Sequence, residues 1–395
     1  MRRLLYLFAA VALFSTQAFA SGFAVKDQGT KAMGMANAFT AVADDASAAW
    51  YNPAALSFQD GVSLTVGGQY VIPSVKYAGA SGAGKMDKKN HLIPFGYISY
   101  NSDALPVTLG LAVNAPFGLS TDWTNSTSTF AVTGLGSVTF SELNLVNVNP
   151  VASFKINDRL SVAGGASYVK ARRVAFNTTG LVQSGNGSGW GGNAALFYKG
   201  DEFNVGLTYR SRTKIKVKGR TTLIAASSTS NTDVSVTLPD MLSAGVAFHP
   251  SDNWLVSFQY DWVNWKTFDQ LKFNYTPAFP GVGASITVPE NYKATSSFGV
   301  GAQWSYNEKM RARFGYSYDQ TPLNDVDFSS RIVDNDRHFF TLGYGYSVSE
   351  KTTIDLAYGY IMVSDRTQTA SSNTAYNGTY KANLHIVSAA MSHRF

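Results

Sequence analysis

The chain has 395 residues, of which 45% are hydrophobic, 13% aromatic and only 15% charged. Soluble domains carry about 25% charged residues, so this composition argues against a large solvated surface. The chain contains no cysteine, which excludes disulfides, thiolate catalysis and cysteine metal sites. The net charge of +6 is too small and too dispersed to indicate nucleic-acid binding.

Residues 1–20 have the three parts of a secretory signal. Arg2 and Arg3 form the charged start, residues 4–14 the apolar core, and Ala18-Phe19-Ala20 a small-x-small cleavage site. The apolar core is too short to span a bilayer as a helix, and no later run reaches the required length. The mean hydropathy of −0.07 also argues against a bundle of membrane helices. The sequence therefore predicts an exported protein that enters a membrane, if at all, as strands.

The segment after the signal differs from everything that follows it. Residues 22–56 are dominated by alanine and glycine, and the segment closes on Trp50-Tyr51-Asn52-Pro53-Ala54. Small side chains let short helices pack tightly, and Pro53 removes a backbone donor and forces a turn. A compact segment of this kind ahead of a long run of strands indicates a plug inside a barrel. We assign residues 21–60 to this plug, which we call the hatch, and residues 61–395 to the barrel.

The barrel region alternates in the manner of membrane strands. In Met310–Asp319, apolar and aromatic side chains point one way, and arginine, glycine, serine and aspartate point the other. The same alternation recurs at residues 203–209, 254–262, 340–348 and 354–362. A soluble sandwich also alternates, but it would need polar residues on its outer face. The bulky aromatic face therefore favours a membrane barrel.

The connections alternate in length, as short periplasmic turns and long external loops do in outer-membrane barrels. Six short turns and seven long loops, with both termini on one side, predict an all-β fold, a fourteen-stranded antiparallel transmembrane barrel. The long loops are expected at residues 77–90, 118–136, 177–187, 220–233, 277–292, 322–336 and 367–380. Fourteen strands enclose more space than their own side chains fill, so the lumen needs a plug or is an open pore.

Several motifs point to one family. Ala43-Asp44-Asp45-Ala46 leads into Asn52-Pro53-Ala54, and Gly189-Trp190-Gly191 and Leu238-Pro239 follow in order along the strands. With these motifs the whole mature chain resembles the FadL-type long-chain fatty acid transporters, a family that includes the toluene and xylene channels. The Asn-Pro-Ala motif at this distance from the signal site is specific, whereas the strand motifs add weight mainly through their order.

The resemblance implies a hydrophobic ligand, an internal pocket and a sideways exit through the barrel wall. The exit is expected at a kinked third strand, here about residues 107–117, where Pro116 and Gly118 support irregular pairing. Phe23 is expected to line the pocket. Arg172 and Lys293 match two basic residues near the bound carboxylate, although Arg173 is an alternative to Arg172. A fatty acid needs a long apolar slot and a cation for its head group.

Each of these assignments has a simpler alternative. Basic residues on strand ends and loops often only meet lipopolysaccharide phosphates, which would explain Arg172 and Lys293. Asn52, Pro53 and Ala54 are expected to form the gate of the hatch, with Asn52 bonding backbone groups that a kinked strand leaves unpaired; the alternative is a turn that only helps folding. Asp44-Asp45 reads as a helix cap.

Few sequence motifs indicate an enzyme, and we expect no catalytic residue, no metal and no cofactor. The glycines of residues 189–194 match a dinucleotide fingerprint only formally, because no βαβ unit surrounds them. A barrel phospholipase using Ser and His is the enzyme alternative. The five histidines fall in different strands or turns.

The sequence thus predicts facilitated diffusion of long-chain fatty acids or similar hydrophobic molecules across the outer membrane of a Gram-negative bacterium. Uptake of aromatic hydrocarbons is one alternative, against which Arg172 and Lys293 argue. A general diffusion porin is another, against which the hatch argues. The expected partners are the ligand, outer-membrane lipid and lipopolysaccharide, with no nucleic acid, and the protein is expected to be a monomer.

Overall fold

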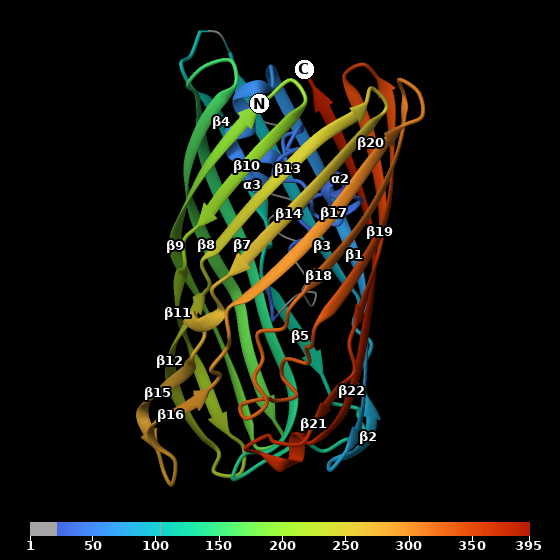
Figure 1. The fold of residues 1–395 in the computed structure, drawn as a ribbon. Helices are drawn as coiled ribbons and strands as arrows, with labels where there is room; N and C mark the ends of the chain where they lie inside the picture. Colours follow the sequence, from blue (N-terminus) through green and yellow to red (C-terminus); the bar gives the residue numbers. More distant parts are fainter. Residues whose placement is uncertain (1–21, 103) are drawn as a thin grey trace.

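The computed structural model describes residues 22–102 and 104–395. They form a closed antiparallel barrel of fourteen wall strands, as the sequence predicts (Figure 1). The predicted signal, residues 1–20, lies outside the described residues. Eight wall strands are continuous: β1 (Gly61–Gly79), β3 (His91–Asn101), β7 (Gly136–Lys155), β8 (Leu160–Thr178), β9 (Leu181–Lys199), β18 (Met310–Asp319), β19 (Arg337–Ser349) and β22 (Gly378–Arg394).

The other six wall strands are each interrupted and consist of two segments. In chain order these are β4 (Thr108–Asn114) with β5 (Gly118–Asp122), β10 (Phe203–Arg210) with β11 (Thr213–Leu223), β12 (Ser228–Leu238) with β13 (Met241–Ser251), β14 (Trp254–Val263) with β15 (Gln270–Phe279), β16 (Gly283–Pro289) with β17 (Thr295–Ser305), and β20 (Thr352–Val363) with β21 (Arg366–Gln368). Four short elements complete the wall region: β2 (Gly82–Lys85), β6 (Ala131–Val132), and the 3-10 turns η2 (Trp265–Thr267) and η3 (Thr374–Tyr376).

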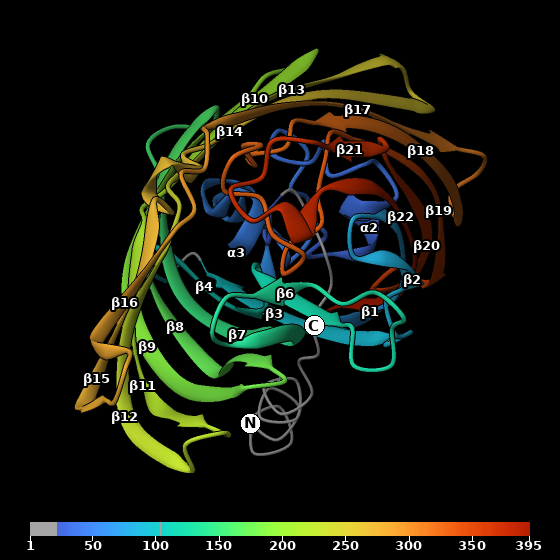
Figure 2. The ribbon, with the colours of Figure 1, turned by 90° about the horizontal axis from the view of Figure 1, so that it is seen from below.

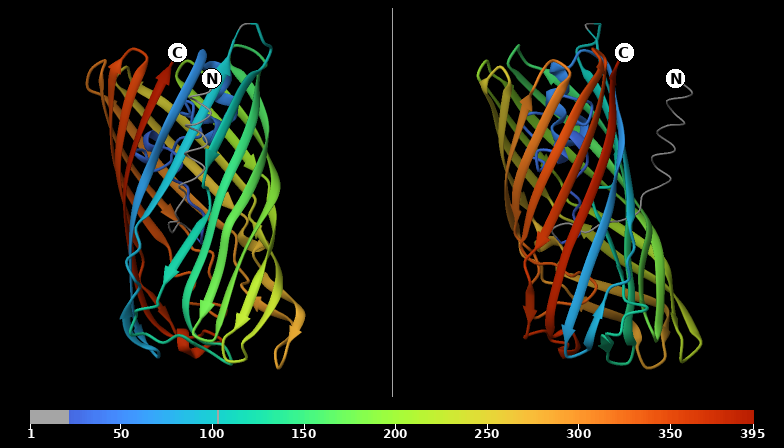
Figure 3. Two further views of the ribbon diagram at one scale, coloured as in Figure 1. Left: turned by 180° about the vertical axis from the view of Figure 1, so that it is seen from behind. Right: turned by 90° about the vertical axis from the view of Figure 1, so that its right-hand side faces the viewer.

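The wall closes on itself because the first and last strands pair along their length. β1 and β22 form an antiparallel ladder from Ser63–Arg394 to Gly79–Gly378. Each wall strand otherwise pairs with its neighbours in the sequence, so the topology is a simple meander (Figure 3). A closed ladder leaves no open sheet edge. A wall in lipid needs this closure, because unpaired backbone groups cost several kcal/mol in the hydrocarbon layer.

The alternation predicted from the sequence is confirmed in the wall. On β18 the side chains of Phe314 and Tyr316 are exposed on the outside, whereas Arg313, which precedes Phe314, is buried inside. The guanidinium of Arg313 lies 2.6 Å from the carboxylate of Asp355 on β20. The outer surface therefore carries aromatic and aliphatic side chains, and the lumen carries the charged ones. No helix in the described part of the chain is both long and apolar enough to cross a membrane.

The prediction of long loops is wrong at three positions. Residues 177–187, 220–233 and 277–292 mostly continue the wall as hairpins, and the connections themselves are only residues 179–180, 224–227 and 280–282. The loop expected at 322–336 exists, but it turns inward. Residues 320–336, which we call the inner loop, bury Phe328, Ile332 and Asp334 inside the barrel.

The described part of the hatch lies inside the barrel, in the upper half of the view in Figure 1, whereas the inner loop lies below it. It contains α2 (Thr30–Met33), α3 (Ala48–Tyr51) and the 3-10 turn η1 (Pro53–Phe58), and nearly all its side chains are buried. α2 contacts β19, β20 and β22, whereas η1 contacts β7, β8 and β9. The hatch therefore touches the wall on opposite sides.

Glycines on the lumen face of the wall make this close approach possible. A Cβ atom at Gly206 would lie 2.1 Å from the carbonyl oxygen of Thr40, and one at Gly315 would lie 2.4 Å from the backbone of Ala36. At Gly343 it would lie 2.9 Å from the Cα of Gly34. Small residues on both sides thus bring the hatch backbone against the wall backbone, which explains the alanine- and glycine-rich composition of residues 22–56.

Candidate ligand cavity and wall opening

The third wall strand is interrupted where irregular pairing was expected. β4 pairs with β3 from Gly96–Val113 to Tyr100–Leu109 and ends at Asn114. After residues 115–117 the strand resumes as β5, whose ladder is formed with β7. Within the described residues no strand ladder joins β5 to β3, so the wall is interrupted beside the first residues of β3.

The first residues of the hatch fill part of this interruption with backbone hydrogen bonds. Ala24 and Phe117 form an isolated antiparallel bridge. The amide of Gly118 donates to the carbonyl of Phe23 at 2.8 Å, and the amide of Val25 donates to the carbonyl of Pro116 at 2.8 Å. Residues 23–25 therefore act as a short extra strand beside the kink.

The side chain of Gln28 completes this contact. Its amide group donates to the carbonyl of Ala115 at 3.1 Å, and its carbonyl oxygen accepts from the amide of Ala115 at 3.2 Å. Gln28 is fully buried. Because unpaired buried backbone groups cost free energy, these partners from the hatch stabilise the kink.

Phe23 is packed among aromatic rings from three directions. Its ring centroid lies 4.6 Å from that of Trp265 and 5.1 Å from that of Phe268, both near η2, and 6.2 Å from that of Phe117 at the kink. The preceding Gly22 has φ +61, and a Cβ there would lie 2.9 Å from the Trp265 ring, so only glycine fits. The Gly22 amide also donates to Asp334 Oδ2 of the inner loop at 2.9 Å. The start of the hatch is thus held in place on several sides.

Phe23 lines an apolar cavity, which we call the outer cavity. It encloses roughly 770 Å³ including its open mouth, and it lies between the hatch, the inner loop and the hairpins of β8–β9, β11–β12 and β15–β16. Most of its lining is apolar, with Leu143, Phe176, Val217, Val234, Phe268, Leu271 and Phe273 among the residues. Such a cavity suits an apolar chain or ring.

Three charged side chains reach the outer cavity. Arg331 of the inner loop lies 2.5 Å from the carboxylate of Glu290, and both side chains are largely buried. The third is Glu142, whose carboxylate lies 3.2 Å from Arg173. The cavity therefore contains one cation that is already paired with a carboxylate.

Of the predicted binding residues, the structure places only Phe23 at the cavity. The side chains of Arg172 and Lys293 are exposed and are not among the residues that line it. The amide of Lys293 donates to the carbonyl of Pro322 at 2.8 Å. Arg173, the alternative to Arg172, approaches the cavity indirectly through Glu142. A role for Arg172 and Lys293 in carboxylate binding stays a prediction.

A second cavity, the inner cavity, lies on the other side of residues 24–26. It encloses roughly 630 Å³, and Pro116, Arg210 and Asp261 are among the residues that line it. Lys26 lies 2.5 Å from Asp319 and 3.4 Å from Asp261, so its ammonium group bridges two wall strands. The Arg210 guanidinium lies 3.6 Å from the centre of the Trp50 ring. Sequence reasoning did not single out Lys26, Arg210 or Arg331.

The Asn-Pro-Ala turn attaches the hatch to the wall, but not to the kinked strand. The Asn52 amide donates to the carbonyls of Thr40 at 3.0 Å and of Leu196 on β9 at 3.1 Å. Its oxygen accepts from the amide of Ala54, and Pro53 begins η1. The hydroxyls of Ser153 on β7 and Ser161 on β8 donate to the carbonyl of Ala54. The expected bond from Asn52 to the kinked strand is therefore not formed.

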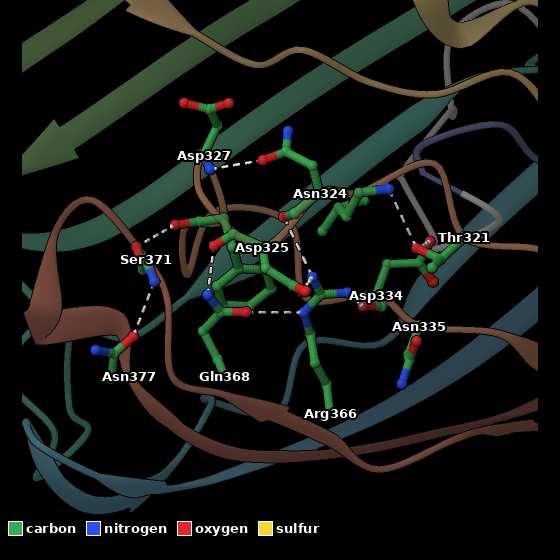
Figure 4. Close-up of polar contacts among 12 residues, drawn as sticks. Thr321, Asn324, Asp325, Asp327, Asp334, Asn335, Arg366, Gln368, Ser371 and Asn377 are labelled. Carbon is green, nitrogen blue, oxygen red and sulfur yellow. Dashed lines mark hydrogen bonds and ion pairs between the residues drawn. The ribbon is translucent and has the colours of Figure 1, made fainter.

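Polar contacts hold the inner loop inside the barrel mouth (Figure 4). Arg366 of β21 lies 2.5 Å from Asp325 and also donates to the carbonyl of Asn324 at 3.2 Å. Arg337 at the start of β19 pairs with the buried carboxylate of Asp334. Ser371 donates to the carbonyl of Phe328. These contacts place Arg331 and Ile332 of the same loop at the outer cavity.

The comparison with known families agrees with this architecture. Residues 11–395 match the family model described as "Outer membrane protein transport protein (OMPP1/FadL/TodX)". The chain belongs to this family. It is therefore an outer-membrane transport protein of a Gram-negative bacterium and not an enzyme.

Individual relatives show how far the likeness extends. The chain is 24% identical to the "Long-chain fatty acid transport protein" of Escherichia coli K12, over 89% of this chain and 90% of the relative. It is 23% identical to "Outer membrane protein P1" of Haemophilus influenzae, over 89% and 88% of the two chains.

Solved structures share the fold. A FadL homologue from Pseudomonas aeruginosa superposes with a TM-score of 0.82 at 18% identity, covering 95% of this chain and all of the other. The Ralstonia pickettii toluene transporter TbuX gives a TM-score of 0.71 at 18% identity, with 95% and 99% of the chains covered.

Proposed function

We propose that this protein carries long-chain fatty acids or similar hydrophobic molecules across the outer membrane by facilitated diffusion. The ligand occupies the outer cavity and leaves sideways through the wall at the interruption between β4 and β5. One observation carries the proposal: Phe23 lines the cavity with its ring and accepts a hydrogen bond from Gly118 at the interruption with its carbonyl. One residue thus touches both the ligand space and the wall opening.

The proposed release step follows from this double contact. A ligand that fills the apolar cavity competes with the Phe23 ring for the space against Trp265 and Phe268. Movement of Phe23 breaks its bond to Gly118 and draws Val25 away from Pro116. The kink then loses its extra strand, and an apolar ligand can pass from the lumen into the lipid without crossing water.

Uptake of aromatic hydrocarbons is a second candidate, and two observations favour it. Arg172 and Lys293 lie outside the cavity lining, and Arg331 is already paired with Glu290. A neutral aromatic ligand needs no free cation, and the rings around Phe23 offer stacking partners. A general porin is disfavoured because the hatch and the inner loop occupy the lumen. Equilibrium binding of a long-chain acid, the alcohol of equal length and toluene would separate the two ligand classes.

We also propose that the protein acts as a monomer with its outer wall in contact with lipid and lipopolysaccharide. The ladder between β1 and β22 closes the wall within one chain. The outer cavity and the interruption beside Phe23 are formed by the same chain as well. A second copy is therefore not needed to complete the transport path.

A disulfide between residues 24 and 117 tests the release step. Ala24→Cys and Phe117→Cys place two cysteines at the isolated bridge, in a chain that otherwise has none. We expect the oxidised variant to bind fatty acid but to transport it at least about tenfold more slowly, with recovery on reduction.

The matched control is the pair Thr65→Cys and Ser392→Cys, which face each other in the β1–β22 ladder. Locking that pair should leave transport unchanged in both redox states. Equal transport by the oxidised and reduced 24–117 variant would exclude release through this interruption. Absence of any fatty acid binding by the reduced protein would exclude the ligand class.

A further inference from the structure

A second break in the wall lies between β12 and β15. Their ladder contains only three residue pairs, Asn231–Thr276, Thr232–Tyr275 and Asp233–Asn274. Both strands continue past this ladder towards the middle of the barrel, β12 to Leu238 and β15 from Gln270. In the described chain these continuations are not paired with each other, although β12 stays paired with β11 and β15 with β16. We call this break the seam.

The seam has a simple cause in the chain lengths. Only two residues, 239–240, separate β12 from β13, whereas six, 264–269, separate β14 from β15. The longer insertion forms η2 and brings Trp265 inside against Phe23. β15 therefore pairs with β12 only near the outer ends of the two strands. Its hairpin with β16 points away from the barrel axis, together with the β11–β12 hairpin (Figure 2).

The outer cavity reaches the seam from within. Val234 and Val236 on β12 line the cavity at one side of the break, and Leu271 and Phe273 on β15 line it at the other. The two valines are buried, whereas Leu271 and Phe273 are only partly buried. Phe268, at the inner end of the seam, lines the same cavity and contacts Phe23. An apolar path thus runs from the break to the ring that contacts the kink.

The outer surface beside the seam is strongly cationic. β11 exposes Lys214, Lys216, Lys218 and Arg220 in alternate positions, and β15 exposes Lys272. No ion pair involves these five residues within the described chain. The carboxylates nearby are Asp233, opposite Lys218 in the β11–β12 ladder, and Asp240 and Asp269 near the inner end, where Asp240 pairs with Arg212.

The position of this cationic row relative to the membrane follows from the residues beside it. Lys216 pairs with Ser188 on β9, so Lys214 lies beside Trp190, which is exposed on the outer wall and packs on Tyr168 with ring centroids 4.9 Å apart. Tryptophan and tyrosine mark the edge of the hydrocarbon layer in membrane barrels. The row begins at that edge and continues outward by about 3.3 Å per residue. The seam therefore opens at the level of the outer-leaflet head groups.

We propose that the seam is a lateral inlet through which single-chain anionic amphiphiles pass from the outer leaflet into the outer cavity. The cationic row attracts the head group, and the chain slides between the apolar edges of β12 and β15. Uptake from the leaflet keeps the chain out of water, which a path through the polar barrel mouth does not. This inference rests on the proposed function and adds the route of access to it.

A cross-link across the seam tests the inlet in the folded protein. Ser235→Cys with Lys272→Cys places one cysteine on each outer edge, and a short bis-maleimide joins them after reconstitution into liposomes. The control pair, Thr222→Cys with Thr229→Cys, spans the intact β11–β12 ladder and leaves the cationic row complete. We expect the seam cross-link to slow uptake of membrane-dissolved fatty acid at least tenfold, and the control cross-link to change it less than twofold.

Each outcome of this experiment is decisive for one claim. Equal uptake with the seam closed would overturn the inlet while leaving the proposed function intact. Failure of the uncross-linked variants and of the unmodified protein to transport fatty acid would instead overturn the proposed function. If the cross-link forms poorly, Val236→Trp obstructs the seam with a bulky side chain instead. Val217→Trp is its control, because it fills the same cavity from β11, away from the seam. Only Val236→Trp should slow access more than it reduces binding.

The cationic row has its own test. Glutamine at positions 214, 216, 218 and 220 removes four charges from an exposed surface without altering the lumen. We expect capture of a long-chain fatty acid from vesicles to fall about fivefold, with a weaker salt dependence, and capture of the matching alcohol to stay the same. Equal loss for acid and alcohol, or no loss for either, would overturn the electrostatic part of the inference.

Discussion

Asn52 shows how one side chain attaches the hatch to the wall. It is completely buried, and its amide satisfies one carbonyl of the hatch, at Thr40, and one of the wall, at Leu196. Asn52→Ala leaves both carbonyls without this donor, at about 1–3 kcal/mol each. Asn52 does not line the outer cavity. We therefore expect lower fatty acid uptake with nearly unchanged equilibrium binding, measured by transport into liposomes and by ligand titration.

Asn90→Ala is the matched control for this substitution. Asn90 is exposed, and its amide donates to the hydroxyl of Tyr70 on the outer wall. Its loss should change neither uptake nor binding. If Asn52→Ala also folds, binds and transports normally, the Asn-Pro-Ala motif is ordinary turn chemistry.

Sequence reasoning located some site residues and missed others for physical reasons. Phe23 was placed at the ligand space from family resemblance, and it does line the outer cavity. The direction of the Arg172 side chain, which is exposed, could not be read from alternation, because the register of β8 shifts between Ala171 and Val174. Arg331 was missed because nothing in a polar loop sequence shows that the loop folds inward.

At the level of elements, strand alternation was informative and loop composition was not. The pattern of aromatic and small residues gave β18 with the bounds predicted, Met310–Asp319. Residues 177–187 are rich in glycine, serine and asparagine, yet most of them pair as strands because the β8–β9 ladder continues up to Asn177–Val182. The kink near Pro116 had a sequence signal, whereas the seam depends on a difference in insertion length between neighbouring strands.

The hatch as an element should respond to pH through Asp27. Burial raises the pKa of the Asp27 carboxyl to about 6, although a hydrogen bond from Asn37 partly opposes this effect. The pKa of this carboxyl is higher in the packed hatch than in the opened hatch. Protonation of the carboxyl therefore favours the packed state. The contribution of Asp27 to the stability of the packed hatch is therefore largest below about pH 4 and is lost as the pH rises to about 6, with no further loss above.

Amide hydrogen exchange of residues 23–30 measures this effect. A pKa shift from 3.8 to about 6 corresponds to an opening equilibrium about fiftyfold higher at pH 7 than at pH 4, after correction for intrinsic exchange. Asp27→Asn should remove this component and leave the remaining pH dependence, which reports the other buried carboxylates. Identical pH profiles for the two proteins would show that Asp27 does not control opening.

For the molecule as a whole, the two wall breaks lie on well-separated parts of the barrel. One is at the third wall strand and the other is between the eighth and ninth of fourteen. The rings of Phe268, Phe23 and Phe117 connect them, with centroid distances of 5.1 Å and 6.2 Å. Alternation, loop lengths and family resemblance together gave the fourteen-stranded fold, because these features repeat along the chain. The path between the breaks depends on contacts between distant residues, and no local pattern reports those.

Deletion of residues 22–56 from the mature chain tests what the hatch does for the whole barrel. The wall ladders, including the closing pair β1–β22, do not use hatch residues, so the barrel should still form. Its exposed lumen would then carry polar groups such as Gln303 and the Arg313–Asp355 ion pair, which favour water. We expect liposomes containing the deletion protein to swell in small sugars, whereas liposomes with the full mature chain do not.

The inner loop decides how large this leak becomes. Deletion removes the bond from Gly22 to Asp334, but Arg337 and Arg366 still hold the loop at the mouth. Sugar permeation should therefore be slower than through an unobstructed fourteen-stranded pore, and it should rise further when Arg366→Ala is added. Asn52→Ala, which keeps the lumen filled, serves as the closed control. A deletion protein that keeps its heat-stable β structure and still excludes sugars would show that the inner loop alone seals the barrel, and the hatch would then serve release of the ligand and not closure of the pore.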